Sequence, residues 1–398
     1  MNKKAYRGRI ITWTDKGNIL DTEGYLLVKN GKIIGISNGS PDVDEVIDFE
    51  DHLILPGFVD THIHLPQVRI RGRWMPNLLD WLEKYVFPEE KKFLDPEYAE
   101  KNAEYFFKKL AMNGTTTAMV YGPPGMEATD AAFKSAKRSG LNVLMGQTLM
   151  DQNVPEELMT GVEDAKRAIR EIHGKWSSER LQYALTIRFA PACSMELMRE
   201  TGKIARELGI RIQTHISEQR DEVELVRRMY GMNYGEVYDK AGLLTPRTVL
   251  AHAIHLSDKE LNLLSKRKVK IAHCPSSNFF LHSGVMPISR IEEFSLEVGL
   301  GSDVAAGPYF NMLEVCRDAC YANPISPEKA FYLATLGGAR VLGLDNRLGS
   351  LEQGKDADFV VLDIQGEDTR DVLSKAVFLG HSGRVMATYS RGREVWVQ

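Results

Sequence analysis

The middle of the chain alternates short apolar runs with longer helical patterns, and this alternation limits the possible folds more than any other feature. The apolar runs predict eight strands, at 58–64, 115–121, 142–147, 182–189, 211–216, 248–253, 269–274 and 297–303. Helical patterns lie between most of them, for example at 97–111, 157–173, 195–208 and 258–265. Eight such units predict an α/β fold with a closed (β/α)8 barrel of the TIM type. An open doubly wound sheet is the alternative, but no Gly-x-Gly-x-x-Gly turn follows the first strand.

The two chain ends have a different pattern, because their apolar runs are strand-like and both ends look all-β. Residues 25–36 predict two strands joined at Asn30-Gly31, a pair that favours a tight hairpin turn. Residues 358–363 and 385–397 are again strand-like, with an interruption at 391–393. We therefore expect the ends to pair in one small β-sandwich module, built from 1–56 and 349–398, beside a barrel of 57–348.

Composition and charge narrow the class of protein. The 398-residue chain is 43% hydrophobic and 26% charged, as in ordinary globular proteins. Its net charge of −4 and the lack of a long basic run argue against a nucleic-acid partner. No apolar stretch suffices for a signal peptide or for the roughly 18 residues of a membrane span, so we expect no membrane partner. Four cysteines without a Cys-x-x-Cys pair favour a reducing cytoplasm.

Two histidines, His62 and His64, stand at the end of the first barrel strand. A strand alternates its side chains between two faces, so residues two apart point to the same side. Both imidazoles would project into one space, while Ile63 turns into the surrounding packing. Two neutral nitrogen donors on one side of a strand are a plausible pair of metal ligands.

The last five of the predicted strands also end on polar residues. Catalytic residues of such barrels gather at the carboxyl ends of the strands. The residues at these ends are Arg188, His215 with Glu218 three positions later, His252, His273 and Asp303. A random scatter of ten histidines would not place them in this way. The sequence therefore predicts a metal-dependent catalytic site at this face of the barrel.

With these motifs, the chain resembles the amidohydrolase superfamily and, within it, the guanine deaminase family. The motifs that carry the resemblance are Pro56 to His64 with Pro66-Gln67, Trp81 to Pro88, Arg188-Phe189, Thr214 to Glu218, Ala272 to Asn278 and Gly301 to Gly307. They cover nearly the whole chain. Ser302 stands where the family pattern has Thr, and Ala306 where it has Gly, but neither change removes a functional group.

The resemblance implies one metal ion per subunit, Zn²⁺ with Fe²⁺ as the alternative. Its ligands would be His62, His64, His215 and Asp303. A single ion is favoured, because Arg188 stands where a bridging lysine would be needed for two. Three residues would act on protons: Asp303 accepts one from the attacking water, His252 orients that water, and Glu218 protonates a ring nitrogen and passes protons to the leaving amine.

The resemblance also implies a small purine substrate, guanine, hydrolysed to xanthine and ammonia. Arg188 would bind its carbonyl oxygen, Gln67 its amide-like edge, and Trp81 and Phe189 its flat faces. Other amino-heterocycles are the alternative substrates: 8-oxoguanine, a pterin, cytosine or a triazine. A catalytically silent scaffold is the alternative from another class. The family also suggests a homodimer.

Some of these residues have simpler structural interpretations. Arg188 could pair with a buried carboxylate instead of substrate, Trp81 could be helix packing, and His273 could fix a loop. Charge clusters such as Glu89-Glu90-Lys91-Lys92 are expected on solvated helix faces. The smaller zinc deaminase fold is excluded, because neither His-x-Glu nor Pro-Cys-x-x-Cys occurs.

Overall fold

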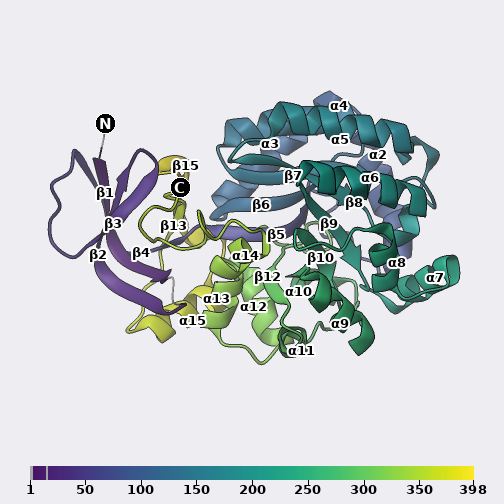
Figure 1. Cartoon of the computed structure of the whole chain (residues 1–398). Helices are drawn as coiled ribbons and strands as arrows, with labels where there is room; N and C mark the ends of the chain where they lie inside the picture. Colours follow the sequence, from purple (N-terminus) through teal and green to yellow (C-terminus); the bar gives the residue numbers. More distant parts are fainter. Residues whose placement is uncertain (1–2, 15–16) are drawn as a thin grey trace.

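The computed structural model describes residues 3–14 and 17–398, and the strands of these residues form two separate sheets (Figure 1). One sheet has eight strands, all paired in parallel with their neighbours in chain order. They are β5 (Phe58–His64), β6 (Thr115–Gly122), β7 (Asn142–Leu149), β8 (Leu181–Ile187), β9 (Arg211–Ile216), β10 (Thr248–His252), β11 (Lys270–His273) and β12 (Glu297–Leu300). All eight lie where the sequence predicts strands, but β8 and β12 end two and three residues earlier, so Arg188 and Asp303 belong to the loops that follow.

The eight-stranded sheet closes on itself, because its first and last strands lie side by side. The hydroxyl of Thr61 in β5 donates a 2.8 Å hydrogen bond to the carbonyl of Leu300 in β12. The two strands approach closely at Gly299, where an added Cβ would lie only 2.8 Å from the Thr61 methyl group. The predicted (β/α)8 barrel is therefore confirmed, and the open doubly wound sheet is wrong.

Helices lie between and after the barrel strands, the longer ones covering the outer side of the barrel (Figure 1). They are α1 (Leu78–Trp81), α2 (Phe87–Lys92), α3 (Pro96–Met112), α4 (Met126–Ser139), α5 (Val162–Trp176), α6 (Met195–Leu208), α7 (Arg220–Tyr230), α8 (Tyr234–Ala241), α9 (Asp258–Arg267), α10 (Pro275–Phe280), α11 (Ile288–Glu293), α12 (Met312–Ala322), α13 (Pro327–Leu333) and α14 (Leu336–Val341). A π-helical turn, η1 (Leu82–Val86), joins α1 to α2, and η2 (Glu156–Leu158) and η3 (Ala190–Ala192) are short 3₁₀ turns.

Helix α6 shows why these segments begin and end where they do. The side chain of Ser194 caps its first turn by accepting a hydrogen bond from the Leu197 N–H. Gly209 ends it in the left-handed conformation. Its buried face consists of residues spaced three or four apart, among them Leu197, Thr201 and Ile204, so the helix packs along one stripe. The sequence predicts these same bounds.

The second sheet has seven strands in the described residues and combines both ends of the chain, as predicted (Figure 1). Its order is β15-β14-β13-β4-β1-β2-β3. The strands are β1 (Lys3–Trp13), β2 (Ile19–Lys29), β3 (Lys32–Ser37), β4 (Glu45–Pro56), β13 (Phe359–Leu362), β14 (Val385–Ser390) and β15 (Arg393–Val397). The hairpin between β2 and β3 turns at Asn30-Gly31, where both residues have positive φ, 55° and 76°. The strands hydrogen-bond as one continuous sheet, and the division at residues 56 and 349 remains a proposal.

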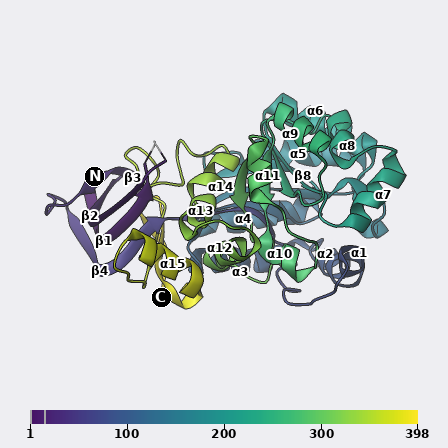
Figure 2. The same ribbon diagram turned by 90° about the horizontal axis from the view of Figure 1, so that it is seen from below.

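The sequence predicts an all-β C-terminal end. This prediction is wrong, because residues 369–379 form helix α15 (Thr369–Leu379). Asp368 caps this helix, and its buried residues Val372, Leu373, Ala376 and Val377 have helical spacing. Helix α15 packs against α12 and α13 of the barrel (Figure 2). The C-terminal segment therefore covers part of the barrel before it returns to the sheet.

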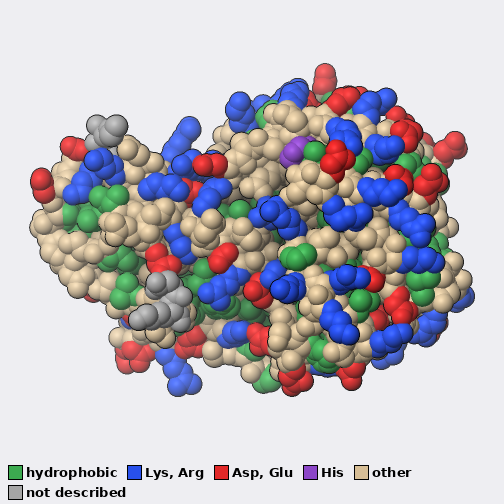
Figure 3. All heavy atoms as spheres, in the orientation of Figure 1, with side chains coloured by type: hydrophobic (Ala, Val, Ile, Leu, Met, Phe, Trp, Pro, Cys, Tyr) green, Lys and Arg blue, Asp and Glu red, His purple; other side chains and the backbone are tan. Residues whose placement is uncertain are grey.

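The surface carries charges of both signs (Figure 3), and the cysteines form no disulfide bonds. On the face shown in Figure 3, acidic and basic side chains are interspersed. Within the described part of the chain, no helix combines the length and the apolar character that a membrane crossing requires. All four cysteines are free thiols, three of them buried.

Candidate active site

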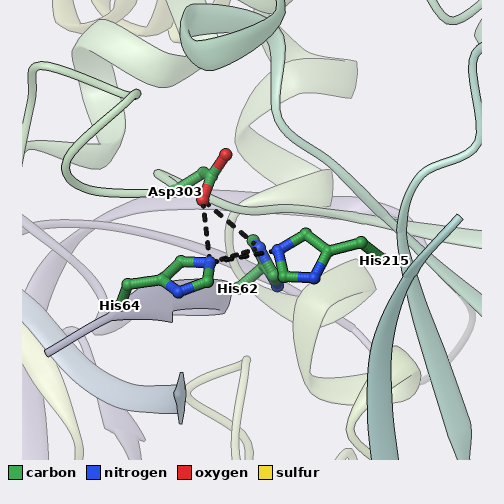
Figure 4. Close-up of side chains that lie close together, drawn as sticks. All are labelled: His62, His64, His215 and Asp303. Carbon is green, nitrogen blue, oxygen red and sulfur yellow. Dashed lines mark hydrogen bonds and ion pairs between the residues drawn. The ribbon is translucent and has the colours of Figure 1, made fainter. Parts of the chain in front are cut away.

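Four side chains from three parts of the barrel meet at the carboxyl ends of its strands (Figure 4). His64 Nε2 lies 3.2 Å from His62 Nε2, 3.1 Å from His215 Nε2 and 3.2 Å from Asp303 Oδ1. His62 Nε2 lies 3.3 Å from the same Asp303 oxygen. Ligand atoms about 2.0–2.1 Å from a tetrahedral zinc ion are about 3.3–3.4 Å apart, so these separations suit one small cation.

The rings of the histidines are held so that their Nε2 atoms face one another. Ile63, between His62 and His64, is fully buried in the main hydrophobic core, as strand alternation predicts. The His215 Nδ1–H donates to the carbonyl of Arg188. The lone pair of Nε2 is therefore free to bind a metal ion. Burial lowers the pKa of His64 to about 4 and the pKa of His215 well below its usual value. Both imidazoles are therefore neutral at pH 7, the form that binds metals.

Asp303 is fixed by contacts between the first strand and the loop after the last one. Its N–H donates to the His62 carbonyl at 2.9 Å. The carboxylate of Asp60 accepts hydrogen bonds from the N–H and the hydroxyl of Ser302, so the serine keeps the polar contact that the family's threonine would offer. Burial raises the pKa of Asp303, but the hydrogen bonds from His62 and His64 outweigh it and hold the pKa well below its usual range. The carboxylate is thus ionised, and the cluster offers three imidazole nitrogens and one anionic oxygen, a donor set that fits a divalent metal ion.

His252 and Glu218 lie beside this cluster. The His252 Nδ1–H donates to Asn278 Oδ1 at 2.9 Å, so Nε2 faces Glu218 Oε2 at 3.4 Å and Asp303 Oδ2 at 3.7 Å. His252 has a φ of 74°, a costly conformation for a residue with a Cβ. Burial, with the nearby charges of Asp303 and Glu222, raises the pKa of Glu218 well above its usual value. A carboxyl that keeps its proton near pH 7 can act as a general acid.

A cavity opens over these groups and contains all four residues predicted to bind substrate. The space in and directly above it, open solvent at its mouth included, is about 370 Å³. Its walls are His64, Gln67, Leu78, Trp81, Leu82, Arg188, Phe189, His215, Glu218, Leu281, Asp303 and Ala306. The Trp81 indole N–H donates to the Arg73 carbonyl, so the ring is fixed and also lines the cavity. The mixture of aromatic, aliphatic and a few converging polar groups is typical of a site for a small heterocycle.

Arg188 pairs with a carboxylate that the sequence analysis placed in solvent. Its Nη1 lies 2.5 Å from Glu90 Oε2, and both side chains are nearly fully buried. The expectation that residues 89–92 form a solvated face is therefore wrong for the two glutamates, which are 5% and 2% exposed. Arg188 nevertheless lines the cavity, so the ion pair and a substrate contact do not exclude each other.

Other polar residues divide into those outside the cluster and those the sequence analysis missed. His273 ends β11 but lies apart from the four donor atoms, and its Nε2 is 3.4 Å from Asn323 Nδ2. His255, three residues after His252, also lies outside the cluster and contacts the Ser283 carbonyl. The missed residues are Asp60, Glu90, Glu222 and Asn278, each of which holds another site residue or its backbone. Asn278 and Asp60 lie within the motifs that carry the resemblance, and their place in these motifs was the only sign in the sequence that they contribute to the site.

The chain was compared with protein families and with proteins of known structure. The family model described as "Amidohydrolase family" matches residues 53–395. The chain belongs to the amidohydrolase family. A guanine deaminase of Escherichia coli (strain K12) is 37% identical, with 94% of this chain and 91% of the relative covered. The Homo sapiens guanine deaminase is 33% identical, with 98% and 96% covered.

A solved structure extends this likeness to the fold. The crystal structure of a guanine deaminase from C. acetobutylicum, with bound guanine in its active site, superposes with a TM-score of 0.93. The two chains are 33% identical, and 99% of this chain and 100% of that chain are covered. The resemblance to guanine deaminases predicted from the sequence is confirmed.

Proposed function

We propose that this amidohydrolase deaminates guanine by hydrolysis, giving xanthine and ammonia. The observation that carries the proposal is the convergence of Arg188, Gln67 and Glu218 on one cavity that His64, His215 and Asp303 of the four-residue cluster also line. The guanine deaminases that resemble the chain over nearly its whole length support the same substrate.

We propose that the cluster holds one Zn²⁺ per chain, with Fe²⁺ as the alternative. Nitrogen and carboxylate donors suit either ion. When bound, such an ion lowers the pKa of a water molecule towards neutrality and so supplies the nucleophile at pH 7. All further steps fall to side chains of the protein.

Three side chains would move or direct protons. Asp303 accepts a proton from the attacking water through its carboxylate, and His252 Nε2, 3.7 Å from Asp303 Oδ2, orients that water towards the amino-bearing carbon. Glu218 donates a proton to the adjacent ring nitrogen, which makes this carbon a better electrophile. The new C–O bond forms first and makes this carbon tetrahedral. The proton that Asp303 accepted then passes through Glu218 to the amine, the C–N bond breaks and ammonia departs. The hydroxyl proton returns to Glu218 as the carbonyl of xanthine forms.

The remaining cavity residues would recognise the ring. The Arg188 guanidinium donates to the carbonyl oxygen of guanine, a charge-assisted hydrogen bond. Gln67 offers a donor and an acceptor to the amide-like edge. Trp81 and Phe189 supply apolar surface for the faces of the purine. Heterocycles without the carbonyl would leave Arg188 without this partner.

Ammonia release from a panel of guanine, 8-oxoguanine, pterin, cytosine and a triazine tests the proposal, with the metal content of the same preparation measured. We expect guanine to be turned over with the highest kcat/KM. Rapid turnover of another ring without guanine turnover would replace the substrate. Absence of turnover on every ring by a metal-loaded preparation would favour a catalytically silent scaffold.

We further propose a cytoplasmic homodimer that acts in purine breakdown. The four free thiols are in keeping with a reducing compartment. Cell fractionation tests the location, and light scattering of the purified protein tests the oligomeric state.

A further inference from the structure

Glu90 occupies an unusual place for a charged residue, because it is buried without contributing to the cavity wall. Its carboxylate lies behind Arg188, with Oε2 2.5 Å from Arg188 Nη1. The Phe87 ring packs against the same guanidinium at 5.1 Å. Arg188 lines the cavity and Glu90 does not, so Glu90 can act on a ligand only through the residues that it contacts, chiefly Arg188.

A local irregularity of the helical segment 78–92 turns Glu90 towards Arg188. Within η1 the chain makes a π turn, and the Phe87 N–H donates to the carbonyl of Leu82, five residues earlier. In a regular helix of about 3.6 residues per turn, the residue about eleven positions after Leu78 would share its face, and that residue is Glu89. The π turn adds about one residue, so Glu90 takes this place. Glu89 instead accepts hydrogen bonds from Tyr98 and Lys92, away from the cavity.

Pro88 gives this π turn a physical cause. A proline inside a helix has no N–H, and its ring collides with the carbonyl four residues earlier. A wider turn immediately before it relieves this collision. The same segment carries Trp81 and Leu82 in the cavity wall. One irregular helix therefore supplies both wall residues and the partner of Arg188.

We propose that Glu90 is a positioning residue that fixes the Arg188 guanidinium for a neutral carbonyl oxygen and thereby sets the preference for carbonyl-bearing heterocycles. The inference rests on the proposed function, because it assigns Arg188 to the carbonyl of the substrate. Glu90 engages one nitrogen of the guanidinium and neutralises its charge. The remaining N–H groups keep a fixed direction, and the neutral pair does not favour an anionic ligand over a neutral one.

Gln67 is a second but weaker partner of Glu90. Its Nε2 lies 3.4 Å from Glu90 Oε1 and 3.2 Å from His64 Nδ1. If His64 binds a cation through Nε2, its Nδ1 carries the proton, and the Gln67 amide must turn to present its oxygen. The contact between Glu90 and Arg188 does not depend on this rotation, so the positioning role is assigned through Arg188 alone.

The test compares the binding of hypoxanthine and purine by titration calorimetry to the metal-loaded protein. Hypoxanthine carries the carbonyl group that purine lacks, and neither carries the amino group that would leave. We expect Glu90→Gln to weaken hypoxanthine binding by about 10-fold or more, because a charge-assisted contact is misdirected, and to change purine binding by less than about 2-fold. Glu89→Gln is the matched control, since it removes the neighbouring buried carboxylate and should change neither affinity.

Further measurements separate positioning from a structural role. Metal content and melting temperature identify a variant that fails to fold. If Glu90→Gln does not fold, Glu90→Asp takes its place, because it keeps the negative charge but moves the carboxylate away from Arg188 by one methylene group. Equal weakening of both ligands, or unchanged hypoxanthine binding by a folded variant, would overturn the proposal. Guanine turnover by the unaltered protein is measured alongside. If guanine is not deaminated, the proposed function fails, whereas normal turnover with unchanged hypoxanthine binding by Glu90→Gln rejects the positioning role alone.

Discussion

The N–H of Asp303 donates a 2.9 Å hydrogen bond to the carbonyl of His62. These two candidate ligands therefore join the first strand of the barrel to the loop after the eighth. Thr61 and Leu300 reinforce the same junction one residue earlier on β5. The contacts that close the barrel therefore also hold two of the candidate metal ligands in place.

Gly301 tests this coupling between barrel closure and the site. A Cβ at this position would lie 2.8 Å from His62 Cβ and 3.1 Å from Cys274 Sγ. We expect Gly301→Ala to displace His62 and to lower metal affinity by about 10–100-fold, the range for changes that disturb ligand orientation. Competition with a chelator measures this affinity. Gly39→Ala, in open space, should leave it unchanged, and an unaltered affinity in Gly301→Ala would contradict the coupling.

Removal of a predicted ligand should empty the site. His64→Ala breaks a cluster in which each donor atom lies close to its neighbours, so we expect loss of bound metal and of ammonia release together. Metal analysis by mass spectrometry and the guanine assay measure the two properties. His273→Ala, at the end of strand β11 but outside the cluster, should retain the metal. Retention of a full metal complement by His64→Ala would remove His64 from the ligand set.

Glu218 should affect the reaction but not the metal. Glu218→Gln keeps the size of the side chain and its contact with Ser283 but removes the acidic proton. We expect kcat for guanine to fall by about 10²–10⁴-fold, the usual contribution of a general acid. Metal content should stay at the level of the unaltered protein. A kcat within a few fold of the starting value would assign the proton transfer to another group.

Arg188 should contribute to both binding and stability. Arg188→Ala should lower kcat/KM for guanine about 10–150-fold, because a hydrogen bond from a charged group contributes about 1.5–3 kcal/mol. It also leaves Glu90 buried without a counter-charge, which costs about 3–5 kcal/mol of unfolding free energy. Urea unfolding checks the second effect. The double change Arg188→Ala with Glu90→Gln should recover part of the stability and none of the activity.

Asp356 makes stability depend on pH. Its fully buried carboxylate contacts Lys32 at 2.8 Å and Arg347 at 2.9 Å. Burial raises the pKa of Asp356, but the hydrogen bonds from Lys32 and Arg347 outweigh it and hold the pKa below its usual value. A carboxyl with a lower pKa in the folded than in the unfolded state stabilises the fold above the unfolded pKa of about 4. This contribution is lost as the pH falls through the folded pKa.

Asp356→Asn should therefore lower the unfolding free energy by about 1.5–3 kcal/mol at pH 7, since it removes the negative charge from the hydrogen bonds that the partly exposed Lys32 and Arg347 make with it. The difference from the unaltered protein should shrink as the pH falls from about 4, where the unfolded state takes up its proton, through the lower folded pKa, below which the carboxyl is protonated in both states. Urea titrations at pH 7, 5 and 3 measure it. Glu163→Gln, which removes an exposed helix pair with Lys166, should change stability by less than about 1 kcal/mol. A constant difference at all three pH values would exclude the proposed linkage.

The features that the sequence predicted well are periodic or local. The segments predicted as strands at 58–64 and 211–216 match β5 and β9, and both are largely buried, as strands of a parallel sheet covered on both faces are. Asn30-Gly31 predicts its turn because both residues tolerate positive φ. The donor residues were found because barrel topology brings strand ends together, whatever their separation in the chain.

The features that the sequence analysis missed depend on contacts between distant segments. Glu90 stands beside Glu89 in a charged run, and only the partner, Arg188, distinguishes the two. Asp60 likewise acts through Ser302, far away in the chain. Helix α15 had local indications, a capping Asp368 and apolar residues at helical spacing, but strand-like neighbours on both sides concealed it.

The π turn at Leu82–Val86 makes the length of this helix as important as its composition. Straightening of the π turn at unchanged chain length would present Glu89, in place of Glu90, to Arg188, whereas deletion of one residue there would restore an ordinary α-helical phase and keep Glu90 in place. The π turn is therefore equivalent to a one-residue insertion, and an alignment gap placed within it keeps each glutamate matched to its own position around the helix. Amidohydrolases that differ in length between Trp81 and Pro88 should be compared by phase around the helix axis, because pairing by residue type alone would match the wrong glutamates.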